Sequence, residues 1–211
     1  MALVKICGLK TIEAAQKAID SGADMLGMIL VPGRARTVDN ETAIQIIEIA
    51  RDTRERRNRS IKNANQLLEA LVKETNGKNA REYQEAACRL IAANGPFVVG
   101  VFRNQPEDEV FSTAEKLGLD FVQLHGKEDK LSFLNRNAQD GRKYGIIPRF
   151  VVPHDAQAIT DIFLPSVRGN GAVVALLDSE GGGEGKVIDW NAVGDLESGS
   201  HILAGGLTPE N

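Results

Sequence analysis

Short apolar runs alternate with helical patterns along most of this 211-residue chain. The runs are typical of buried strands, and each ends at a polar or glycine-containing loop. The candidate strands cover residues 3–6, 25–30, 97–102, 121–126, 146–152, 172–177 and 202–204. Strands that alternate with helices pair in parallel, because the helical crossover returns the chain to the end where the previous strand began. The sequence therefore predicts an α/β fold of barrel or doubly wound size, with seven parallel strands and no eighth.

The composition favours an enzyme that acts on small molecules. A formal net charge of −4 argues against a general affinity for nucleic acid or anionic membranes. Cys7 and Cys88 lie far apart, without the spacing of a disulfide framework or a zinc site, so we expect a reducing compartment and no metal. Lys5 and Lys10 interrupt any signal-peptide core, and no apolar run approaches the length of a membrane span. We therefore expect a cytoplasmic protein with no nucleic-acid or membrane partner.

The alternation breaks between residues 52 and 95, where the connection to the next strand is much longer than a βα unit needs. The segment begins with a basic run, residues 52–60, and helical patterns follow around Leu67 and Tyr83 with Gly77 between them. A basic run can contact nucleic acid or a partner, but it is more often a solvated helix face or a loop. We therefore expect one barrel domain over residues 1–211 with a helical or mobile insertion at about 52–95, peripheral to the site.

Chemically useful side chains lie where the candidate strands end, and in a parallel sheet these ends meet at the edge that carries the site. Cys7 and Asp178 are a thiol and a carboxyl group that can face each other there, which suits proton transfer between a base and an acid. The guanidinium of Arg36 suits a carboxylate or phosphate. Gly205–Gly206 expose N–H groups ahead of a helix start, which suits an anion. His125 ends another strand.

Each of these residues also has a simpler interpretation when taken singly. Cys7 could be a small buried side chain, Arg36 a surface charge, His125 a loop residue and Gly205–Gly206 a tight turn. The glycine-rich stretch 181–185 fits neither the phosphate-loop nor the dinucleotide pattern, because the residues at the required positions differ. It follows a strand end directly, so it is either a flexible linker or a lid over a site.

Eight ordered motifs resemble one family along nearly the whole chain, the insertion excepted. The chain resembles phosphoribosylanthranilate isomerase of tryptophan biosynthesis in its fungal form. The matching motifs are Val4–Leu9, Gly22–Asp24 with Gly27, Arg34–Thr37, Val99–Phe102, Val122–Gly126, Leu177–Gly185, Asp189–Asn191 and Leu203–Leu207. The resemblance implies a (β/α)8 TIM barrel.

The resemblance also implies an activity and a set of site residues. The family catalyses the Amadori rearrangement of N-(5-phosphoribosyl)anthranilate to 1-(2-carboxyphenylamino)-1-deoxyribulose 5-phosphate without a cofactor or metal. By resemblance, Asp178 is the general acid that protonates the furanose ring oxygen, and Cys7 is the general base that removes a proton from the adjacent sugar carbon. Arg36 would hold the anthranilate carboxylate, and Gly205–Gly206 would bind part of the phosphate. The family motif also places Gln123 and His125 among the substrate-binding residues.

The chain departs from the family at its C-terminal side, where the family pattern continues with a helix, an eighth strand and a final helix. We expect these elements to be absent from residues 1–211. Two other functions therefore stay open: another sugar-phosphate isomerase of this fold, such as the one in histidine biosynthesis, and a truncated, inactive barrel that acts as a binding or interaction module. Members of the family are fused to other tryptophan-pathway domains in some fungi, so such domains are the protein partners that the resemblance suggests.

Overall fold

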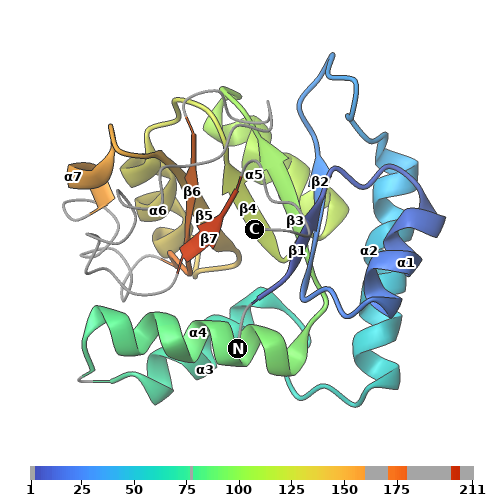
Figure 1. The fold of residues 1–211 in the computed structure, drawn as a ribbon, viewed down its shortest axis with the longest axis horizontal. Coiled ribbons are helices and arrows are strands. Elements are labelled where there is room, and N and C mark those ends of the chain that lie inside the picture. The colour runs from blue at the N-terminus through green and yellow to red at the C-terminus, as the bar shows by residue number, and fades with distance from the viewer. Residues whose placement is uncertain (1–2, 77, 160–170, 180–200, 205–211) are drawn as a thin grey trace.

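The computed structural model describes residues 3–76, 78–159, 171–179 and 201–204. Within them, seven strands form one parallel sheet in sequence order, which confirms the predicted architecture (Figure 1). The strands are β1 (Lys5–Cys7), β2 (Met25–Ile29), β3 (Phe97–Phe102), β4 (Phe121–Leu124), β5 (Gly145–Val151), β6 (Ala175–Asp178) and β7 (His201–Leu203). Asp178 is thus the last residue of β6, and Cys7 is the last residue of β1.

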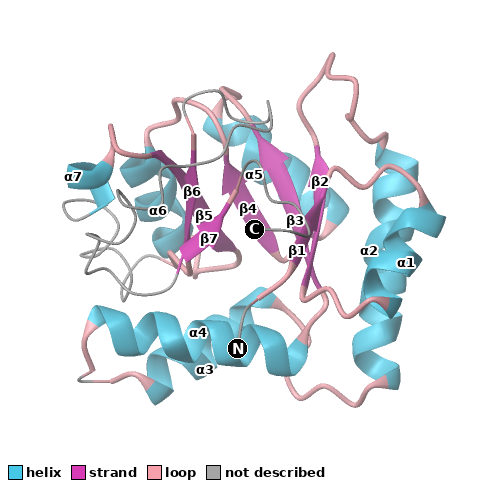
Figure 2. Cartoon of the chain, in the orientation of Figure 1, coloured by secondary structure: helices cyan, strands magenta, loops and turns pink. Residues whose placement is uncertain are grey.

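Helices follow most of these strands and cover the sheet (Figure 2). They are α1 (Ile12–Asp20), α2 (Asn40–Arg56), α3 (Ala64–Glu74), α4 (Ala80–Asn94), α5 (Glu107–Leu117), α6 (Lys130–Gln139) and the short α7 (Ala156–Ala158). Five of the helices begin at a residue whose side chain accepts a hydrogen bond from a free backbone N–H in the first turn, which satisfies a donor that the helix itself leaves unpaired. These N-caps are Thr11, Asp39, Asn63, Asn79 and Asp129.

The two central strands, β3 and β4, are buried along their whole length. Strands covered on both faces can be apolar at every position, which explains the continuous run Phe97–Phe102. Phe97 and Phe121 start these strands and pack edge to face, with ring centroids 5.6 Å apart. The hydrophobic core therefore lies inside the curved sheet and between the sheet and its helices.

The segment between residues 52 and 95 contains the end of α2 and two further helices, at the opposite end of the strands from the expected site. Asp52–Arg56 is the last part of α2, and α3 and α4 lie across the end of the sheet where the strands begin (Figure 1). Leu67, Leu71 and Ile91 are fully buried and belong to the main core. The two helices therefore close the base of the fold, because the apolar faces that the sequence pattern revealed pack against the strands.

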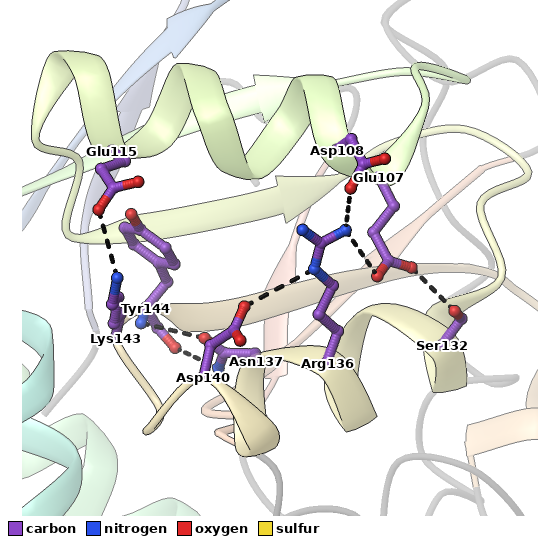
Figure 3. Close-up of polar contacts among 9 residues, drawn as sticks. All are labelled: Glu107, Asp108, Glu115, Ser132, Arg136, Asn137, Asp140, Lys143 and Tyr144. Atoms are coloured by element: carbon purple, nitrogen blue, oxygen red, sulfur yellow. Dashed lines mark hydrogen bonds and ion pairs between the residues drawn. The ribbon is translucent and has the colours of Figure 1, made fainter.

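Helices α5 and α6 are joined by an exposed network of charged groups (Figure 3). The Arg136 guanidinium pairs with Asp108, with Glu107 at 3.5 Å and with Asp140 at 3.6 Å. The Ser132 hydroxyl donates to Glu107 at 2.8 Å. These contacts connect one face of α6 to the first turn of α5.

None of the described helices combines the length and the apolar character that crossing a membrane requires.

Candidate active site

A cavity of about 480 Å³ opens at the carboxyl ends of the strands. Side chains of a strand alternate between its two faces, so every second residue of each strand points to the inside of the curved sheet. The cavity shows this period-two pattern on five strands and the loops that follow them. The pairs are Lys5 and Cys7, Ile29 and Val31, Val101 and Arg103, Gln123 and His125, and Leu176 and Asp178.

Cys7 is the last residue of β1, and two glycines beside it, Gly8 and Gly27, leave space for the side chains around them. A Cβ atom at Gly27 would lie 2.9 Å from both Cys7 Sγ and Lys5 Nζ, so a larger residue there would displace the thiol or the ammonium group. Gly8 has a φ of +85°, a conformation that favours glycine, and a Cβ atom there would lie 3.1 Å from Arg36 Nη1. The Cys-Gly sequence therefore lets Arg36 lie directly beside the end of β1. The Cys7 side chain is accessible to solvent from the cavity side.

The loop after β2 carries Arg36 and is held at both ends. The Thr37 hydroxyl donates to the Val31 carbonyl, and Thr37 N donates to the Arg34 carbonyl at 3.0 Å. Lys10 Nζ, from the loop after β1, donates to the Ala35 carbonyl at 2.9 Å. These bonds fix the loop over the cavity, so that Arg34 and Arg36 both line it.

Asp178 is almost completely buried, yet its carboxyl group lines the cavity. Its Oδ1 accepts a hydrogen bond from Ser179 N at 2.9 Å. Its Oδ2 accepts one from Arg149 Nε at 2.8 Å and lies 3.7 Å from His125 Nε2. The carboxyl group therefore has a defined orientation before any ligand binds.

Gln123 and His125 extend from β4 towards the same point. The Gln123 amide nitrogen lies 3.2 Å from His125 Nδ1 and is a donor, so Nδ1 accepts and the proton of the neutral ring is on Nε2, facing Asp178. Burial, together with the positive charge of Arg149, lowers the pKa of His125 to about 4, although Asp178 opposes the shift. The ring is therefore neutral near pH 7. Gln123 lines the cavity, and its Oε1 is buried without a hydrogen-bond partner among the described residues.

The cavity is lined by several cations. Lys5, Arg34, Arg36 and Arg103 all line it, together with the Asp178 carboxyl group. Side chains of this kind suit a small ligand with more than one negative charge, such as a phosphate and a carboxylate. The thiol and the carboxyl group supply a proton acceptor and a proton donor in the same space.

The cavity thus contains five of the seven residues that the sequence suggested as site residues: Cys7, Arg36, Gln123, His125 and Asp178. Gly205, Gly206 and the glycine-rich stretch 181–185 lie outside the described residues. Their roles, and the catalytic and binding roles of the other five, remain predictions.

Sequence reasoning missed four cationic residues at or beside the site. Lys5 lies two residues before Cys7, and the period of a strand could have identified it. Arg103 directly follows β3, in the same relation to its strand as His125. Arg34 lies within a loop that was identified only through Arg36. Arg149 lies inside β5 and had no local signal, because its partner Asp178 is 29 residues away.

Comparison with known proteins agrees with this geometry. The family described as "PRAI: N-(5'phosphoribosyl)anthranilate (PRA) isomerase" matches residues 52–211. The N-(5'-phosphoribosyl)anthranilate isomerase of Candida albicans is 48% identical over 211 residues, which are 100% of this chain and 83% of that protein. The enzyme of the same name from Komagataella pastoris is 40% identical over 213 residues, covering 100% of this chain and 84% of its own.

Solved structures of the same family share the fold. The phosphoribosyl anthranilate isomerase of Thermus thermophilus superposes with a TM-score of 0.62 at 28% identity, over 100% of this chain and 80% of its own. The structure from Thermotoga maritima has a TM-score of 0.64 at 24% identity, with the same coverage, and supports the fold alone. The seven described strands form part of the (β/α)8 barrel of these relatives. The chain therefore belongs to the N-(5'-phosphoribosyl)anthranilate isomerase family.

Proposed function

We propose that this chain catalyses the Amadori rearrangement of N-(5'-phosphoribosyl)anthranilate in tryptophan biosynthesis, with Asp178 as general acid and Cys7 as general base. The observation that carries the proposal is the shared cavity: it is lined by one thiol, one carboxyl group and four cations. The substrate carries a carboxylate and a phosphate, so its charge complements the cations.

The first step is ring opening. Asp178 donates its proton to the furanose ring oxygen, the bond between that oxygen and the carbon that carries the anthranilate nitrogen breaks, and the nitrogen supplies the electron pair of the resulting iminium. The orientation of the carboxyl group, held by Ser179 N and Arg149 Nε, supports this role because proton transfer requires a fixed distance and angle.

The second step is proton removal from the sugar carbon next to the iminium. The Cys7 thiolate takes this proton, and the electron pair of the C–H bond neutralises the iminium to give an enolamine. Tautomerisation then gives the aminoketone, so the overall change is an isomerisation with no net transfer of protons or electrons. Because the substrate nitrogen is the electron sink, the protein has only to orient the substrate and move two protons.

Substrate binding is assigned to the cationic wall of the cavity. Arg36 lies next to Cys7, and its planar guanidinium binds the anthranilate carboxylate through two parallel hydrogen bonds. Gln123 Oε1 accepts a hydrogen bond from a hydroxyl or N–H of the substrate, which satisfies its unpaired buried oxygen. Gly205 and Gly206 contribute backbone N–H groups to the phosphate site.

A kinetic comparison of two cysteine variants tests the proposal. Cys7→Ala should lower kcat by about 10²–10⁴-fold, the usual cost of losing a general base, with little change in product affinity. Cys88→Ala is the matched control, because Cys88 lies on α4 at the opposite end of the strands, and it should keep the parental kcat. A Cys7→Ala variant that turns over within a few-fold of the parent would exclude the thiol as base. If the parent itself binds the phosphorylated ligand but shows no turnover, the chain is a binding module instead.

A further inference from the structure

Arg149 lies next to the proposed acid but does not line the cavity that holds it. Its side chain is 11% exposed and extends from β5 to the end of β6. It lines a second cavity of about 690 Å³, which it shares with Arg103, His125 and Lys130. Arg103 and His125 line both cavities, so Arg149 approaches Asp178 from a space next to the one that holds the proposed substrate.

The guanidinium of Arg149 makes two contacts with the end of β6. Nε donates to Asp178 Oδ2 at 2.8 Å, and Nη2 donates to the Ser179 carbonyl oxygen at 2.8 Å. The first contact orients the carboxyl group, and the second fixes the peptide that follows it. Ser179 N in turn donates to Asp178 Oδ1. The three bonds connect side chain and backbone, so that neither can rotate without breaking a bond.

We propose that Arg149 is a positioning residue that sets the orientation of the Asp178 carboxyl group for proton transfer to the substrate. This inference rests on the function proposed above, in which Asp178 is the general acid.

Arg149 Nε donates to one Asp178 carboxyl oxygen and Ser179 N donates to the other, so each donor occupies one acceptor direction. Each oxygen keeps one further acceptor direction, and Asp178 lines the cavity with Oδ2 3.7 Å from His125 Nε2. The carboxyl group is thus held in one orientation at the cavity wall, where a substrate can reach it.

The geometry requires arginine rather than any cation. A lysine has one compact ammonium group and cannot make two parallel contacts in a fixed plane, whereas the guanidinium fork does so with little loss of side-chain freedom. Arg149→Lys should therefore keep the charge and lose the orientation. Arg149→Met should lose both.

Steady-state kinetics on the full chain separates these effects. We expect kcat to fall by about 10²-fold in Arg149→Met, the size of effect that a small misplacement of a catalytic group produces, and KM to change much less. Arg149→Lys should recover only a minor part of this loss. Lys130→Met is the matched control: it removes a cation from the same second cavity without touching Asp178, and should keep the parental kcat. Circular dichroism and the urea midpoint of each variant establish that the fold is intact.

An NMR titration of His125 provides a readout that does not depend on activity. The charge of Arg149 helps to lower the pKa of His125, so Arg149→Met should raise that pKa towards 6.5 while Arg149→Lys leaves it near the parental value. If Arg149→Lys has lost kcat although its His125 pKa is unchanged, orientation and not charge is responsible. A folded Arg149→Lys variant with the parental kcat would overturn the proposal. So would a folded Arg149→Met variant with the parental kcat, provided that Asp178→Asn abolishes the activity of the parent. If Asp178→Asn itself keeps its kcat, the acid assignment and this inference both fall.

Discussion

Two buried arginine–aspartate pairs lie at opposite ends of the same sheet and have different surroundings. Arg54 and Asp120 pair at 2.9 Å where β3 and β4 begin, and their side chains are 1% and 4% exposed. Arg149 and Asp178 pair at 2.8 Å where β5 and β6 end, with side chains 11% and 2% exposed. The chemical pair is the same, so any difference in role has to come from what else each carboxyl group can reach.

Every contact of the first pair is internal to the fold. Arg54 Nη1 also donates to the Pro96 carbonyl at 2.6 Å, and its guanidinium lies 5.1 Å from the centroid of the Phe97 ring. Asp120 Oδ2 accepts a further bond from Val98 N. Burial raises the pKa of Asp120, and the charge of Arg54 opposes that rise. The pair therefore joins α2 to the start of the sheet, and its effect is on stability.

The second pair has one side open to the cavity. Asp178 Oδ2 faces His125 and the cavity as well as Arg149, so a ligand can reach the carboxyl group. A buried carboxyl group that faces a cavity can exchange a proton with a ligand, whereas one that is enclosed by protein cannot. The comparison shows that access to the cavity, and not the type of pair, separates a structural contact from a candidate catalytic one.

The largest expected effect concerns Asp178, the proposed acid of the pair that faces the cavity. Asp178→Asn keeps the shape and an acceptor for either Arg149 Nε or Ser179 N but cannot deliver a proton, so kcat should fall by about 10²–10⁴-fold. The free energy of unfolding should change far less than it does in variants of the Arg54–Asp120 pair, which is enclosed by protein. Steady-state kinetics and urea unfolding of the same preparation measure both. If the variant loses affinity but keeps its maximal rate, Asp178 is a binding residue, and the two arginine–aspartate pairs do not differ in catalytic role.

The enclosed pair should give the opposite result. Arg54→Met leaves the Asp120 charge buried without its partner, and should lower the free energy of unfolding by about 3–5 kcal/mol while kcat per folded molecule is unchanged. Adding Asp120→Asn removes the remaining charge and keeps an acceptor for Val98 N, so the double variant should be more stable than Arg54→Met alone. A double variant no more stable than the single one would show that the charge is not what destabilises the single variant.

A smaller effect should appear in the pH dependence of stability. The pKa of His125 is lowered to about 4 in the folded state, against 6.5 for the free side chain, so the folded state favours the neutral ring. Above about pH 6.5 the ring is neutral in both states and the free energy of unfolding is not reduced. As the pH falls towards 4, only the unfolded state gains the proton, and the free energy of unfolding falls by an amount on the order of 1–3 kcal/mol. Urea unfolding at several pH values should show the loss in the parent, and His125→Asn should show a flatter curve over the same interval. Parallel curves would mean that the ring is not held neutral by the fold.

The smallest effect is expected for the exposed network between α5 and α6. Arg136 is 36% exposed, and Asp108 is 89% exposed, so solvent screens their attraction. Arg136→Gln, which keeps much of the aliphatic stem, should cost less than about 1 kcal/mol of unfolding free energy, and added salt should reduce the difference further. A salt-independent loss comparable to that of Arg54→Met would contradict the view that burial sets the strength of these pairs.

The sequence predicted the parallel strands and the edge where the site lies, but it could identify only those site residues whose position is visible in the local pattern. Cys7 and His125 could be identified because each ends an apolar run, and in a parallel sheet all such ends meet at one edge. Arg54 was part of a basic run that indicated a solvated helix face or a loop, yet it is one of the most completely buried side chains. Its partner is 66 residues away, so no local pattern could reveal the pair.

The alternation of strand and helix patterns by itself determined a parallel α/β fold, because hydrophobic periodicity is a local property that each segment carries independently of the others. The positions of Cys7 and Asp178 at strand ends follow from the same pattern. Only the tertiary structure decided that α3 and α4 close the base of the sheet, that Arg54 is buried against Asp120, and that Arg149 holds Asp178. Each of these depends on contacts between segments far apart in sequence, whose distances and orientations are set by the packing of the whole sheet.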